Sequence, residues 1–201
     1  MAKRIEVSGI LAAGKSTLCD VFAEHGFPVA REDVRNNPYW IKAQKDPARY
    51  ELLLQKWILK QRFAEVANAV SSPSPIPYVI DYCLAVDKAY ADFYLSRTAP
   101  SDMAKTHRAI DRMYKANGNP DLVIHLHCDS DELLRRIKHR GRDFEQAHTI
   151  EFLDALGEKI KYYLDALKAD GSVPVWEIDT TKGLPEIDGH AIRKIMGMVS
   201  P

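Results

Sequence analysis

The sequence predicts an α/β protein in which a five-stranded parallel sheet lies between layers of helices. Two observations predict this class. Short apolar segments alternate with longer segments of helical periodicity, and the first alternation passes through a glycine-rich turn. Apolar strands that are joined through helices favour a parallel sheet buried on both faces.

The expected strands and helices follow one another along most of the chain. Strands are expected at residues 5–9, 27–30, 77–81, 121–126 and 173–178. Helices are expected at residues 15–24, 47–70, 84–96, 101–116, 131–140, 150–169 and 185–198. Asp46 is the expected N-cap of the long second helix, and Pro47 suits its first turn.

Length and charge set broad limits on the kind of protein. The chain has 201 residues, with 28 Lys and Arg against 28 Asp and Glu, so we expect one domain over residues 1–201. A net charge of zero removes bulk positive charge as a reason to expect a nucleic acid or a membrane as partner. Cys19, Cys83 and Cys128 form no disulfide framework and no metal-binding spacing, which favours the cytoplasm.

A phosphate-binding motif lies between the first expected strand and helix. Residues 9–16 read GILAAGKS and satisfy the pattern G-x-x-x-x-G-K-[ST]. In this motif the glycines let backbone N–H groups converge on phosphate oxygens, the lysine (Lys15) neutralises the outer phosphates, and the hydroxyl of Ser16 binds Mg²⁺. The motif predicts binding of a nucleoside triphosphate. The expected nucleotide-binding residues are Gly9, Leu11, Ala12, Ala13, Gly14, Lys15, Ser16 and Thr17.

A second candidate for phosphate chemistry is the basic segment 135–142, which reads RRIKHRGR and holds five cations without an acid. Arg136 and Arg140 are four residues apart and share a helix face, and Gly141 frees the backbone before Arg142. Phosphoryl transfer requires positive charge on the migrating group, so we expect a lid at about residues 138–148 with these three arginines catalytic. The alternative is a solvated basic helix end.

Several motifs together resemble the deoxynucleoside kinase family over roughly residues 4–170. They are residues 9–17, Asn37-Pro38-Tyr39, residues 46–50, Gln55 with Arg62, Asp81, and the segment Arg136 to Glu145, which ends in Arg-Gly-Arg-x-x-Glu. The resemblance implies a three-layer P-loop kinase fold. It also implies a homodimer that transfers the γ-phosphate of ATP, or of another nucleoside triphosphate, to the 5′-hydroxyl of a deoxynucleoside with Mg²⁺.

The resemblance also implies roles for single residues. Glu32 matches the catalytic base, although the neighbouring Asp33 competes for this assignment, and Gln55 matches the side chain that reads the base edge. Arg62 and Asp87 match a base-binding ion pair, whose alternative is a salt bridge between helices. Further matches are Glu145 and Gln44 at the sugar 3′-hydroxyl, and Asp81 with Ser16 and Glu32 at the metal.

Two positions depart from the family pattern. Tyr82 stands where an arginine follows the carboxylate at the end of the third strand, and Arg31 or Arg35 is a hypothetical substitute. Gln44 stands where a tyrosine normally holds the 3′-hydroxyl. Trp40, Trp57 and Tyr90 are candidates for a base-stacking pocket, with the hydrophobic core as the alternative.

Because the resemblance implies that the Arg62–Asp87 pair binds the base, the acceptor is expected to be a purine deoxynucleoside, with deoxycytidine close behind. Two alternatives stay open. A nucleoside monophosphate kinase of the thymidylate type needs extra cations for the acceptor phosphate, and Arg31, Arg35 and Arg49 are available. A non-catalytic nucleotide-binding protein is the other, because Tyr82 and Gln44 depart from the family pattern at functional positions.

Overall fold

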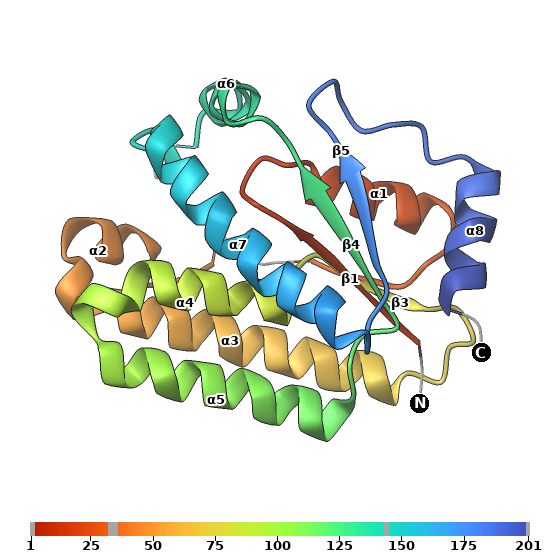
Figure 1. Ribbon diagram of the computed structural model, residues 1–201, viewed down its shortest axis with the longest axis horizontal. Coiled ribbons are helices and arrows are strands. Elements are labelled where there is room, and N and C mark those ends of the chain that lie inside the picture. Colours follow the sequence, from red (N-terminus) through yellow and green to blue (C-terminus); the bar gives the residue numbers. More distant parts are fainter. Residues whose placement is uncertain (1–2, 32–35, 143–144, 200–201) are drawn as a thin grey trace.

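The computed structural model describes residues 3–31, 36–142 and 145–199 (Figure 1). Its strands are β1 (Arg4–Gly9), β2 (Val29–Ala30), β3 (Tyr78–Ile80), β4 (Leu122–His127) and β5 (Val175–Asp179). Its helices are α1 (Lys15–Glu24), α2 (Trp40–Lys45), α3 (Pro47–Ser71), α4 (Leu84–Thr98), α5 (Pro100–Asn117), α6 (Ser130–Arg140), α7 (Ile150–Asp170) and α8 (Gly189–Val199).

The five strands form one parallel sheet in the order β2-β3-β1-β4-β5, which confirms the expected fold class. The central strand β1 places Ile5 beside Val79 of β3 and Leu122 of β4. All three side chains are fully buried, as expected for a sheet that is covered on both faces.

Helices cover both faces of this sheet (Figure 1). Helices α4 and α7 pack against each other in front of the strands, and α1 lies behind them. Helix α6 lies near the carboxyl ends of β4 and β5, the edge where parallel α/β sheets bind ligands. The described helices include none that is long and apolar enough to cross a membrane.

Most element boundaries agree with the expectation, and two do not. The Asp46 side chain accepts a hydrogen bond from the backbone N–H of Arg49 at 3.2 Å, and Pro47 occupies the first turn of α3, as predicted. Helix α2 was not expected, because six residues are too few to show a period of 3.6. Helix α8 begins at Gly189 instead of residue 185.

A buried ion pair connects the central strand to the start of α4. Arg4 Nε donates to Glu6 Oε1 at 3.1 Å, and both side chains are almost fully buried. Glu6 Oε2 accepts from the backbone N–H of Leu84 at 3.1 Å and from the hydroxyl of Tyr114 at 3.2 Å. Glu6 therefore holds the first residue of α4, the helix that carries Asp87.

Candidate active site

The phosphate loop joins β1 to α1 through backbone conformations that suit glycine. A Cβ on Gly9 would lie 2.7 Å from the carbonyl oxygen of Leu126, and Gly14 has a φ of 101° just before α1. Ala12 has a φ of 63°, which is uncommon for a residue with a side chain. The loop thus combines close approach to β4 with left-handed turns that expose backbone N–H groups at a helix N-terminus.

Lys15 begins α1 and folds back along the loop. Its Nζ donates to the carbonyl oxygens of Gly9 at 2.9 Å and Ile10 at 3.1 Å. These bonds hold a positive charge beside the backbone N–H groups of the loop, where the motif predicts the outer phosphates.

Ser16 and Asp81 meet at the end of the phosphate loop, as expected for a metal site. The Ser16 hydroxyl donates to Asp81 Oδ2 at 2.8 Å, and Asp81 is 4% exposed. Mg²⁺ takes oxygen ligands and keeps several waters, so a hydroxyl and one carboxylate beside bound phosphates suit it. The described residues contain no group of three acidic, histidine or cysteine side chains that forms a complete metal cage.

A cavity of about 690 Å³ lies between the phosphate loop, α3, α4 and the segment that follows α6. A cavity of this size can enclose most of a drug-sized ligand. The predicted site residues that line it are Gly9, Leu11, Ala12, Gly14, Lys15, Ser16, Thr17, Gln44, Gln55, Arg62, Asp81, Asp87, Arg136, Arg140, Arg142 and Glu145.

Two expected residues that the structure describes, Ala13 and Arg31, are not among the residues that line this cavity. Ala13 is fully buried behind the loop, where its carbonyl oxygen accepts from the Thr180 hydroxyl at 2.9 Å. Glu32 and Arg35 lie outside the described residues. Arg31 is described, and its side chain pairs with Asp20 of α1 at 2.7 Å.

The wall of the cavity that α3 and α4 form holds the expected ion pair between Arg62 of α3 and Asp87 of α4. Tyr82 contacts the arginine of this pair in two ways. The Tyr82 hydroxyl donates to the Arg62 carbonyl oxygen at 3.0 Å, and the Arg62 guanidinium lies 4.7 Å from the centre of the Tyr82 ring. A guanidinium over an aromatic face is attracted to it. Tyr82 thus positions the charged pair from the place where the family carries an arginine.

A second carboxyl on this wall, Glu51, was missed by the sequence reasoning. Glu51 is 5% exposed, and its Oε1 accepts from Gln55 Nε2 at 2.9 Å. Burial raises the pKa of Glu51, and the hydrogen bond from Gln55 opposes this effect without cancelling it. The spacing of four residues to the expected base reader Gln55 was the available signal.

Two of the arginines expected in the lid contact one buried acid, Glu145. Arg140 Nε donates to Glu145 Oε2 at 2.6 Å, and Arg142 Nη1 donates to Glu145 Oε1 at 3.4 Å, while Glu145 is 4% exposed. Arg140 and Arg142, two of the three arginines expected to be catalytic, therefore meet at Glu145, and all three line the cavity. Next to them, His148 stacks on Phe152 with ring centres 4.2 Å apart, and burial lowers the pKa of His148.

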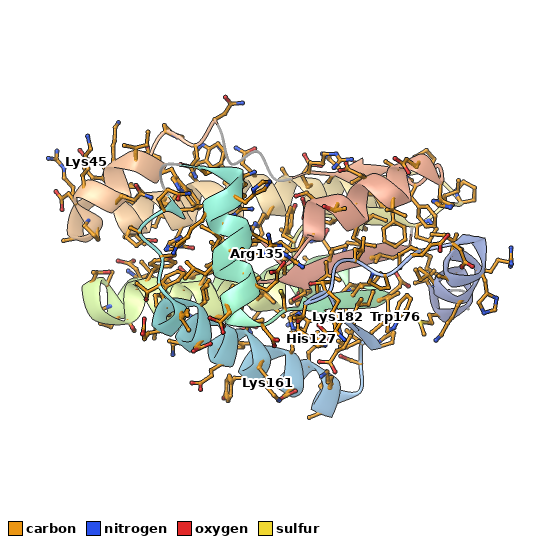
Figure 2. All side chains as sticks on the ribbon, turned by 90° about the horizontal axis from the view of Figure 1, so that it is seen from above. Lys45, His127, Arg135, Lys161, Trp176 and Lys182 are labelled. Atoms are coloured by element: carbon orange, nitrogen blue, oxygen red, sulfur yellow. The ribbon has the colours of Figure 1, made fainter. Side chains whose placement is uncertain are left out.

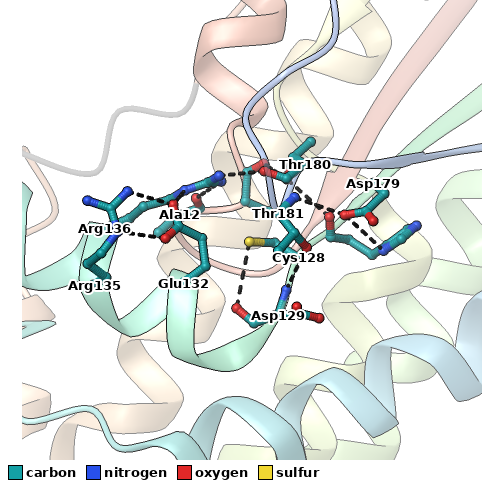
Figure 3. A network of polar contacts seen from close by, with 11 residues as sticks. Ala12, Cys128, Asp129, Glu132, Arg135, Arg136, Asp179, Thr180 and Thr181 are labelled. Carbon is teal, nitrogen blue, oxygen red and sulfur yellow. Dashed lines mark hydrogen bonds and ion pairs between the residues drawn. The ribbon is translucent and has the colours of Figure 1, made fainter.

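Arg136 ties α6 to the phosphate loop and to the turn after β5 (Figure 3). Its Nε donates to Glu132 Oε1 at 2.8 Å, and its other nitrogens reach the carbonyl oxygens of Ala12 and Thr180. Hydrogen bonds from Arg135 and Arg136 lower the pKa of Glu132 to about 2. Seen from above, α6 with Arg135 crosses the middle of the molecule (Figure 2). Arg136 of the same helix lines the cavity.

The aromatic candidates divide between the cavity and other surroundings. Trp40 and Tyr90 line the cavity, whereas Trp57 is not among its lining residues. Tyr94, one turn after Tyr90, was not expected there; the two rings stack with centres 6.4 Å apart. Helix α4 therefore supplies two of the aromatic side chains that line the cavity, and the others, Trp40, Tyr82 and Phe152, come from other segments.

A phosphate loop at the edge of a parallel sheet, beneath an arginine-bearing helix and beside an acceptor-sized cavity, defines the class of P-loop kinases. The chain belongs to the deoxynucleoside kinase family, whose family model, described as "Deoxynucleoside kinase", matches residues 5–199. The chain is thus an enzyme that phosphorylates the 5′-hydroxyl of a deoxynucleoside from a nucleoside triphosphate. Family membership decides against the monophosphate kinase and the non-catalytic alternative.

Similar proteins agree with this assignment, and solved structures share the fold. A deoxyadenosine kinase of Lactobacillus acidophilus is 34% identical over 176 residues, which are 81% of this chain and 79% of the relative. A deoxyguanosine kinase of Dictyostelium discoideum is 30% identical over 85% of this chain and 62% of the relative. The structure of deoxyadenosine kinase from M. mycoides with bound dCTP shares the fold, with a TM-score of 0.74, 23% identity, and coverage of 96% of this chain and 97% of that one.

Proposed function

We propose that the enzyme prefers purine deoxynucleosides, with deoxycytidine next, and uses ATP or another nucleoside triphosphate as donor. One observation carries this proposal: a single cavity is lined both by the phosphate loop and by Gln55, Arg62 and Asp87. An amide and a charged pair offer donors and acceptors together, which suits the mixed hydrogen-bonding edge of adenine, guanine or cytosine. The deoxyadenosine and deoxyguanosine kinases among the relatives support the preference.

On the donor side, the phosphate loop and Lys15 hold the triphosphate. Arg136, Arg140 and Arg142 stabilise the charge on the migrating group and help to exclude water from it. Ser16 and Asp81, together with Glu32, hold Mg²⁺, whose chemical contribution is to neutralise charge on the phosphate oxygens.

On the acceptor side, Glu32 accepts the proton of the 5′-hydroxyl as that oxygen attacks the γ-phosphorus. Gln44 and Glu145 hold the sugar 3′-hydroxyl. Gln55 with the Arg62–Asp87 pair fixes the base, so the attacking oxygen is positioned before the chemical step.

We also propose that residues 1–201 form one domain, with the lid at about residues 138–148, and that the enzyme works as a homodimer. The three cysteines are free, which supports a reducing compartment such as the cytoplasm.

A panel of acceptors tests the proposed function. The purified protein is incubated with ATP and Mg²⁺ and with each of the four deoxynucleosides and their 5′-monophosphates, and the products are separated by chromatography. We expect the highest kcat/KM for deoxyadenosine or deoxyguanosine and no diphosphate from the monophosphates. Faster turnover of thymidine would overturn the acceptor preference, and faster turnover of a monophosphate would overturn the acceptor assignment. The Lys15→Ala variant, whose kcat/KM is expected to be strongly reduced, is the low-activity control.

A further inference from the structure

The side chains of α3 that face the cavity follow one helical stripe. Glu51, Gln55, Ile58 and Arg62 line the cavity at spacings of four, three and four residues, which places them along one face. Gln55 therefore has Glu51 one turn before it, and beyond it the pair of Arg62 with Asp87.

Glu51 restricts how Gln55 can present its amide. An ionised carboxylate only accepts hydrogen bonds, so the amide must turn its NH₂ group toward Glu51, and Nε2 lies 2.9 Å from Glu51 Oε1. Turning the amide over would bring two acceptor oxygens together at a buried position, which is costly. Gln55 retains its Oε1 acceptor and the second N–H of Nε2 for a ligand.

The far end of the stripe is occupied by the ion pair of Asp87 with Arg62. An exocyclic amino group at this end of the amide donates to Gln55 Oε1. A ring nitrogen next to that amino group accepts from the remaining N–H of Gln55.

A 6-oxopurine fits this arrangement poorly in either direction along the stripe. With its oxygen toward Asp87, the oxo group faces the Oε1 acceptor of Gln55, and the N1–H of the base faces the remaining N–H of Gln55. With its oxygen toward the other end, the oxo group lies beside the Glu51 carboxylate. Adenine and cytosine both carry an amino group next to an acceptor nitrogen, so both match the fixed amide.

We propose that Glu51 determines base specificity by positioning the Gln55 amide, and that it favours acceptors with an amino group next to a ring nitrogen over 6-oxopurines. This inference rests on the proposed role of Gln55 and narrows the purine preference to adenine. Glu51 acts through Gln55 and is a positioning residue. Because burial raises the pKa of Glu51, keeping this acid ionised costs the protein folding free energy. Such perturbed acids are typical of functional positions.

Deoxyadenosine and deoxyinosine are the sharpest pair of probes, because they share the sugar and differ only in the donors and acceptors at positions 1 and 6. We expect kcat/KM for deoxyadenosine to exceed that for deoxyinosine by about 5- to 100-fold in the wild type, as for one misplaced buried hydrogen bond. Glu51→Gln keeps the volume but both accepts and donates, so it allows both directions of Gln55. In the Glu51→Gln enzyme the ratio of kcat/KM for deoxyadenosine to kcat/KM for deoxyinosine should fall at least about fivefold, toward one.

Glu158→Gln is the matched control, because it makes the same change at an exposed position of α7. It should leave the ratio unchanged. Glu51→Ala is the second variant, since removing the carboxylate also frees the amide. Separate kcat and KM values for both nucleosides distinguish altered selectivity from a general loss of activity, because a general loss would lower kcat/KM for both nucleosides equally.

The outcomes separate the two proposals. A wild type that uses deoxyinosine as well as deoxyadenosine overturns the inference, as does an active Glu51→Gln enzyme whose ratio stays within twofold of wild type. Either result leaves the proposed phosphorylation of deoxynucleosides standing. A wild type that phosphorylates no deoxynucleoside refutes the proposed function, and the inference with it.

Discussion

Replacing Glu6 with alanine should destabilise the fold by about 3–5 kcal/mol, because the Arg4 guanidinium then stays buried without its carboxylate. Arg4 and Glu6 are 1% and 0% exposed, so water cannot replace the lost partner. The backbone N–H of Leu84 and the hydroxyl of Tyr114 lose their shared acceptor as well. The effect is therefore expected at the upper end of this range.

Urea unfolding followed by circular dichroism measures this loss as a change in the free energy of unfolding with an unchanged m value. In a thermal scan the same loss lowers the melting temperature by about 6–20 °C. Glu158→Ala removes an exposed glutamate and should stay within about 0.5 kcal/mol of wild type.

A double variant separates an unpaired charge from a general loss of packing. Replacing Arg4 with methionine and Glu6 with leucine removes both charges together, so it should be more stable than Glu6→Ala alone. The reasoning is refuted if Glu6→Ala costs less than about 1 kcal/mol, or if the double variant is as unstable as the single one. Since Leu84 begins the helix that carries Asp87, Glu6→Ala should also raise the KM for the deoxynucleoside.

Three further changes test the site. Lys15→Ala should lower kcat/KM by about 100- to 1,000-fold, the usual loss for one preorganised donor, with little change in melting temperature; retained activity would contradict its role. Asp81→Asn should raise the Mg²⁺ concentration for half-maximal rate, and an unchanged Mg²⁺ dependence would remove Asp81 from the metal site. The pKa of Glu51 is higher in the folded protein than in the unfolded chain, where it is about 4.3. The wild type therefore loses stability as the pH rises from the unfolded pKa through the folded pKa. Glu51→Gln should therefore be the more stable protein at neutral pH, with no advantage below pH 4; equal stability at neutral pH would contradict this sign.

Patterns among residues close together in the sequence were enough to predict most of the fold and the phosphate-binding side of the site. The strands, the capped start of α3 and the phosphate loop depend on residues within a few positions of one another, so periodicity and spacing were enough to predict them. The resemblance implied that Ser16 and Asp81 serve one metal, and their hydrogen bond agrees with that, because the segments after β1 and β3 meet at the carboxyl edge of neighbouring parallel strands. Helix α2 escaped prediction because its six residues are too few to show a period.

Contacts between distant segments were decided by tertiary structure alone. Sequence showed that Tyr82 departs from the family pattern, but only the packing of α3 against the end of β3 shows that it supports Arg62. Only the tertiary structure shows that Glu51 is buried and bonded to Gln55, where a carboxylate restricts its neighbour strongly. Local spacing sets which side chains share a helix face, whereas burial, which gives a charge or a hydrogen bond its strength, depends on what packs over that face.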